Sequence, residues 1–181
     1  MNKNYGLNLE LEKQQQDGTE YLAGSISCIA EIPESEREKY LPKGEIQKGK
    51  EDTMDCATRA PLNILETKID WLYQNNLLPE ETKKWLEDED YVLSGGRIEL
   101  SDAYIAILSG TTEQGNSLKA PLQAIHEFGV IPKHLLPLRT DMTFKEYINP
   151  ERITESMKRL GQEFIKRLPI RYAKEYDFKN F

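Results

Sequence analysis

The sequence predicts a mainly helical α+β protein. Apolar residues recur at spacings of three and four in several segments between residues 56 and 168, which is the pattern of amphipathic helices. Loosely alternating apolar and polar residues near both ends, at 21–32 and 170–176, predict short strands. The chain of 181 residues has the length of one domain, or of one and a fraction, and can bury a single core.

The first 50 residues are the least regular part of the pattern. Residues 1–20 are polar and contain a run of three glutamines, so we expect a flexible arm that ends in a turn. One or two short strands are expected over 21–32, which Pro33 bounds. The charged stretch 34–39 predicts a short helix before a loop that contains proline and glycine.

The strongest helical pattern in the first half begins at Cys56 and continues to about residue 74. Pro61 falls in its first turns, where a proline is tolerated better than in mid-helix. The apolar positions predict a wide buried stripe that consists of Ala57, Ala60, Ile64 and Trp71, with Pro61, Leu65, Ile69 and Leu72 beside it.

Two shorter helices are predicted next. Pro79 opens one over about 80–90, and Ser94-Gly95-Gly96 predicts a turn after it. Ser101 is a suitable N-cap for the second, which carries apolar residues at 104, 105 and 108.

The stretch 109–116 is rich in glycine, threonine and serine and predicts a loop. Another helix begins at Ser117 or Lys119 and ends at Gly129, which has the character of a C-cap glycine.

The last helix is predicted to start at Asn149-Pro150, as N-cap and first helical residue. Its apolar positions follow at spacings of four, three and four: Ile153, Met157, Leu160 and Phe164. The strand predicted over 170–176 needs a pairing partner.

The charge balance argues against nucleic acid as a partner. Lys and Arg number 24 against 31 Asp and Glu, which gives a net charge of −7 and a pI near 5.1. No apolar run approaches the ~20 residues of a membrane helix, and the N-terminus has no apolar region of a classical secretion signal. We therefore expect no membrane partner and no secretion signal.

Cysteine and histidine are scarce. The chain has two cysteines, Cys28 and Cys56, and two histidines, His126 and His134. They show no metal-ligand spacing, and two cysteines do not make a disulfide framework, so we expect no metal site and no cofactor. Cys28 is most simply a small buried apolar residue.

Cys56 is the one residue whose setting suggests a nucleophile. It follows a loop and begins the predicted helix, where unpaired backbone amides favour thiolate. Asp55 acts in the opposite direction, because a nearby anion disfavours thiolate. The alternative interpretation is that Cys56 is a small buried residue at a helix start.

Several motifs then follow in order between residues 50 and 140. They are Asp52-Thr53-Met54-Asp55-Cys56 with Glu66 ten positions after the cysteine, Leu100-Ser101-Asp102, the loop Gly110 to Leu118 with Gly115-Asn116-Ser117, and the helix 119–128 followed by Gly129-Val130-Ile131-Pro132 and Leu136-Pro137. Their order and spacing resemble the nucleophile-bearing half of papain-like cysteine peptidases, more closely the papain-like proteins of tailed bacteriophages. The resemblance implies the helical subdomain of a papain-like fold over 21–140, with the β subdomain largely missing. Residues 1–20 are then an N-terminal arm, and 141–181 a C-terminal helix and strand extension.

In that family the cysteine that opens the central helix is the nucleophile, which is Cys56 here. The side-chain donor of the oxyanion hole is a glutamine six residues earlier, where this chain has Lys50, and Gln47 stands out of register. Gln47, Lys50 and Asp55 are therefore the oxyanion or cleft candidates on this side. The resemblance makes Glu66 a structural acid that holds a backbone or basic partner.

The glycine loop of the family lines the substrate cleft, which implies that role for Gly115, Asn116 and Ser117. The family's catalytic histidine lies beyond the matched region. His126 and His134 match no histidine motif of the family, and they are the only histidines of this chain that remain as candidates for the base.

Two functions stay open. The first is a phage-type papain-like cysteine peptidase unit, in which Cys56 attacks a peptide or protein substrate and the base comes from another chain or a lost segment. The second is a catalytically inactive virion or assembly protein that keeps the half-fold as a packing module. Lys50, Ala57 and the missing histidine favour the second, as does an edge strand over 170–176 that would associate with another chain.

Both functions imply a location in the virion or the bacterial host cytoplasm. A cell-wall type amidase ranks last, because the segments after residue 76 look helical.

Overall fold

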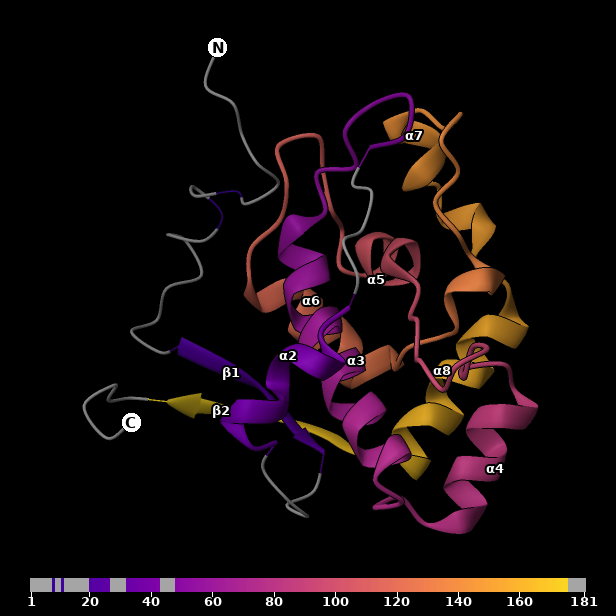
Figure 1. The fold of residues 1–181 in the computed structure, drawn as a ribbon. Helices are drawn as coiled ribbons and strands as arrows, with labels where there is room; N and C mark the ends of the chain where they lie inside the picture. The colour runs from indigo at the N-terminus through magenta and orange to yellow at the C-terminus, as the bar shows by residue number, and fades with distance from the viewer. Residues whose placement is uncertain (1–7, 9–10, 12–19, 27–31, 43–47, 176–181) are drawn as a thin grey trace.

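The computed structural model describes residues 8, 11, 20–26, 32–42 and 48–175, with only the backbone of 20–26 and 171–175. This part of the chain is mainly helical, as predicted (Figure 1). The elements in chain order are β1 (Glu20–Ile26), η1 (Glu34–Glu36), α2 (Arg37–Tyr40), α3 (Cys56–Gln74), α4 (Glu80–Asp88), α5 (Asp102–Leu108), α6 (Lys119–Phe128), η2 (Lys133–Leu135), α7 (Phe144–Tyr147), η3 (Pro150–Arg152), α8 (Glu155–Arg167) and β2 (Ile170–Glu175). Most of the arm predicted over 1–20, together with Cys28 and Gln47, lies outside the described residues.

Helix α3 is the central element, and α2, α5, α6 and β1 all pack against it (Figure 1). It continues through Pro61, as predicted. The buried stripe is narrower than predicted, because Ala60 is exposed and Ile64 is 49% exposed. Residues four apart share a helix face, so Cys56, Ala60 and Ile64 form one row along the outer side of α3.

Two acidic side chains of α3 hold the segment that precedes α5. Glu66 Oε1 accepts a hydrogen bond of 2.6 Å from the amide of Leu100, and Asp70 Oδ1 accepts one of 2.6 Å from the amide of Ile98. The backbone partner of Glu66 agrees with the structural role expected for it. Ser101 caps α5, as predicted, by accepting from the amide of the third helical residue at 3.2 Å.

Helices α6 and α8 approach closely at a pair of glycines. Gly129 ends α6 with a φ of 71°, a conformation that glycine adopts readily. A Cβ atom on Gly161 of α8 would collide with the carbonyl oxygen of Phe128. The C-cap glycine expected at 129 is therefore confirmed, and Gly161 makes the close crossing possible.

The last helix begins later than predicted. Asn149 and Pro150 start only the 3₁₀ turn η3, and Ile153 then adopts an extended conformation. Thr154 caps α8 by accepting from the amide of Met157 at 3.3 Å. The reason for the difference is that a second capping residue restarts the helix after the proline turn.

Strand β2 finds its partner within the chain. It pairs antiparallel with β1, from Glu20 opposite Glu175 to Ile26 opposite Ile170, with an irregularity between Ala23 and Ser25. The expected pairing partner is therefore β1, and in this two-stranded sheet each strand still has one unpaired edge.

The segment after residue 140 shares the main core. Phe164 of α8 is fully buried, with its ring centroid 5.4 Å from that of Tyr91 and 6.4 Å from that of Trp85. Tyr147 and Leu168 belong to the same hydrophobic cluster. In the described part of the chain, no helix has the length and apolar character needed to cross a membrane.

Candidate active site

Cys56 is the first residue of α3, and its side chain is half-buried. Burial is the largest influence on the thiol and raises the pKa of Cys56 above its ordinary value. A hydrogen bond from the backbone amide of Ala57 lowers this pKa, while the charges of Asp55 and Asp52 raise it. The amides at the helix start thus favour thiolate as expected, but the opposing influences are larger and the group rests as a thiol.

The loop before Cys56 is tied to the segment before α7. A bridge between Lys48 and Asp52 closes the loop, and the amide of Lys50 donates to the carbonyl of Met142 at 3.1 Å. The carboxylate of Glu51 accepts from the amide of Phe144 at 2.7 Å. Lys50 itself is exposed, so the candidate at the oxyanion position takes part in this tie through its backbone.

Asp55 does not line a cleft, because its side chain is fully buried. Its Oδ1 atom accepts from the Thr53 hydroxyl at 2.7 Å and from Arg59 Nε at 3.0 Å. Its Oδ2 atom accepts from the Tyr147 hydroxyl at 2.5 Å. Asp55, a candidate for the oxyanion site or the cleft, therefore lies in the interior of the protein.

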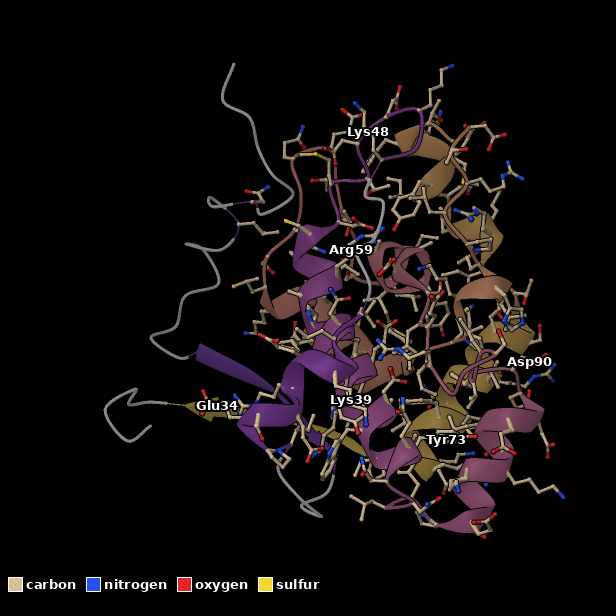
Figure 2. All side chains as sticks on the ribbon, in the orientation of Figure 1. Glu34, Lys39, Lys48, Arg59, Tyr73 and Asp90 are labelled. Atoms are coloured by element: carbon tan, nitrogen blue, oxygen red, sulfur yellow. The ribbon has the colours of Figure 1, made fainter. Side chains whose placement is uncertain are left out.

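Arg59 extends this interior cluster to α5. Its Nη2 atom lies 3.2 Å from Asp102 Oδ2, and both side chains are nearly inaccessible, at 4% and 6% exposed. Figure 2 shows Arg59 pointing from α3 into the interior beside α5. One guanidinium therefore bridges two buried carboxylates and fixes the first turn of α3 to the start of α5.

The glycine loop is built on a buried asparagine. Asn116 Nδ2 donates to the hydroxyl of Ser109 at 2.9 Å and to that of Thr111 at 3.2 Å, and its Oδ1 accepts from the amide of Ser117. Gly115 is buried with a φ of 89°, where a side chain would be strained. The side chains of Asn116 and Ser117 are buried and shape the loop from inside, in place of the cleft-lining role expected for them.

One backbone carbonyl of the glycine loop, that of Asn116, binds a residue far away in the sequence. The carbonyl oxygen of Asn116 accepts a hydrogen bond of 2.8 Å from the amide of Asn8. A segment distant in sequence therefore contacts this carbonyl through its own main chain.

Neither histidine is placed at the start of α3. His126, in the last turn of α6, lies with Nδ1 3.1 Å from the carbonyl oxygen of Ile170, where β2 begins. His134 is an exposed residue of η2. The first turn of α3, marked by Arg59, and the start of β2 lie in separate parts of the view (Figures 1 and 2).

Sequence reasoning missed the buried cluster behind Cys56. Asp55 and Arg59 stand four residues apart on a predicted helix, which is a recognisable ion-pair spacing. Asp102 and Tyr147 carried no such signal, because their contacts to the first turn of α3 are set only by the packing of α5 and α7.

Within the described residues, no group of three or more His, Cys, Asp or Glu side chains could hold a metal ion. No protein-family model matches the chain, and no curated protein or solved structure is significantly similar to it.

Proposed function

We propose that this chain is a papain-like cysteine peptidase unit of the bacteriophage type, with Cys56 as its nucleophile. The observation that carries the proposal is the position of Cys56, half-buried as the first residue of a long helix. Amides at that helix end interact with the sulfur, as a cysteine nucleophile requires.

The reaction would start with removal of the thiol proton by a base. The sulfur then forms a bond to the substrate carbonyl carbon, and the carbonyl electrons move to its oxygen. The amide of Cys56 is a donor suited to that oxyanion. Collapse of the intermediate expels the amine, which takes the proton from the base and leaves an acyl-cysteine for water to hydrolyse.

The raised pKa of Cys56 makes the base essential, because little thiolate forms without one. Both histidines lie on other elements, so we assign the base to another polypeptide segment. The exposed row that includes Ala60 and Ile64 runs from the thiol along α3 and offers an apolar surface for that segment. A phage-encoded unit of this kind would act in the virion or in the host cytoplasm.

Recognition of an extended peptide would rely on the backbone of the glycine loop. The Asn116 carbonyl accepts a main-chain amide from Asn8, and this contact supports the proposal that the backbone of a substrate binds there. Asn116 and Ser117 contribute by holding the loop in shape.

The experiment compares covalent labelling of Cys56 by a peptidyl fluoromethyl ketone and by iodoacetamide, with peptide mapping by mass spectrometry. For each reagent, the labelling rate of Cys56 is divided by the rate of its reaction with glutathione. We expect this ratio to be larger for the peptidyl reagent than for iodoacetamide. Cys56→Ala is the control for labelling elsewhere. If the ratio for the peptidyl reagent does not exceed the ratio for iodoacetamide, the peptidase proposal is wrong.

The second candidate function is an inactive virion or assembly module with the same half-fold. The raised pKa of the Cys56 thiol favours it, because a resting thiol is a poor nucleophile. In that case Cys56→Ala leaves assembly intact, while Ile64→Asp on the exposed row of α3 abolishes it. Normal assembly of Ile64→Asp, measured by analytical ultracentrifugation with the partner particle, would exclude this surface.

A further inference from the structure

Asp55 is the N-cap residue of α3, but its side chain accepts no hydrogen bond from the helix amides. An aspartate at this position usually accepts from the second or third amide of the helix. The first amides of a helix have no acceptor within it, so a capping carboxylate is their normal partner. In this helix the carboxylate is drawn elsewhere.

The carboxylate of Asp55 is held instead by the side chains of three residues. Thr53 and Arg59 bind Oδ1, and the Tyr147 hydroxyl binds Oδ2. Tyr147 is 1% exposed, and burial followed by the charge of Asp55 raises its pKa well above the ordinary value, so it remains a hydroxyl donor.

Tyr147 is itself rigidly placed. Thr143 and Glu146 form a capping box at the start of α7. At the other end of α7, Arg152 Nη1 donates to the carbonyl of Tyr147 at 2.7 Å, and its Nη2 donates to the carbonyl of Pro137 at 2.9 Å. The hydroxyl therefore approaches Asp55 from a fixed support.

We propose that Tyr147 is a positioning residue for Cys56: it keeps the Asp55 carboxylate from capping α3 and so leaves the first amides to the cysteine sulfur. The amides of Ala57 and Cys56 are the backbone groups that favour thiolate at this sulfur. Without the tyrosine hydroxyl, Oδ2 loses its buried donor, and rotation toward the helix amides is the nearest remedy. The carboxylate would then compete with the sulfur for those amides and bring its charge closer.

This inference rests on the proposed role of Cys56 as nucleophile, but its test does not require peptidase activity. The rate of Cys56 alkylation by iodoacetamide is measured against pH in the full chain and in Tyr147→Phe. We expect the profile of the variant to shift upward by about half a pH unit, which is about a threefold lower rate below the thiol pKa.

Tyr91→Phe is the matched control. Tyr91 is also fully buried and donates its hydroxyl to the carbonyl of Val130 at 2.8 Å. Its loss should lower stability and leave the alkylation profile of Cys56 unchanged. In an Asp55→Ala background, the effect of Tyr147→Phe on the profile should disappear, because the competing carboxylate is gone.

If Tyr147→Phe lowers stability as Tyr91→Phe does but leaves the Cys56 profile in place, Tyr147 is only a structural residue and the inference is wrong. Should Tyr147→Phe fail to fold, Thr53→Val removes another donor to Asp55 and must shift the profile in the same direction. A shifted profile without preference for the peptidyl reagent would leave this inference standing and overturn the peptidase proposal alone.

Discussion

Removal of Arg59 should destabilise the fold strongly, because its guanidinium compensates the charges of two buried carboxylates. In Arg59→Met the aliphatic stem is largely kept, and Asp55 and Asp102 lose the guanidinium that lies 3.0 and 3.2 Å from them. Both acids are buried, at 1% and 5% exposed. Breaking a buried pair from one side costs about 3–5 kcal/mol, so we expect the free energy of unfolding to fall by at least about 3 kcal/mol.

The assay is urea unfolding at pH 7 followed by far-UV circular dichroism. The control is Lys158→Met, which breaks the exposed pair between Lys158 and Glu155 and should leave the stability nearly unchanged. Adding Asp55→Asn to Arg59→Met should recover part of the loss, because one uncompensated charge is removed. A loss below about 1 kcal/mol in Arg59→Met would refute the reasoning that this guanidinium neutralises the interior cluster.

Three further outcomes follow from the packing. Gly161→Ala should destabilise by about 2 kcal/mol or more in urea unfolding, because its Cβ collides with the Phe128 carbonyl, whereas Gly110→Ala, with a φ of 73° and open space around it, should cost only about 1 kcal/mol. Ser101→Ala should cost about 1–2 kcal/mol in the same assay, since it removes the cap of α5; no loss would contradict that role. Burial raises the pKa of Asp70 from 3.8 to about 6, so the folded state binds its proton more tightly than the unfolded state. The stability of the wild type relative to Asp70→Asn should therefore fall as pH rises from about 4 to 6, by at most about 3 kcal/mol, and a difference that is flat with pH would exclude this linkage.

Local sequence signals predicted the elements well where capping chemistry and periodicity agree. The start of α3 at Cys56, the cap at Ser101 and the C-terminal glycine at 129 are all local features, and the structure confirms them. The start of α8 differs from the prediction because two suitable capping residues, Asn149 and Thr154, stand only five positions apart. Periodicity alone cannot choose between them.

The candidate site was less predictable, because its contacts join segments far apart in the chain. Asn116 and Asp55 were expected near a cleft from their positions in motifs, but burial turns both side chains inward. Only the packing of α7 brings Tyr147 to Asp55, and no pattern within either segment reports that pairing. The sequence pattern therefore did not reveal which way a polar side chain points when it lies in a loop or at the start of a helix.

The β1–β2 ribbon has a consequence for how the chain reaches its final state. Its strands are separated by the 143 residues from 27 to 169, so the ribbon closes a very large loop. Such distant pairing gains nothing until the rest of the chain has collapsed, which places it late in folding. During synthesis on the ribosome, β1 stays unpaired with β2 until nearly all of the described chain has emerged. A chaperone would be of most use in that interval.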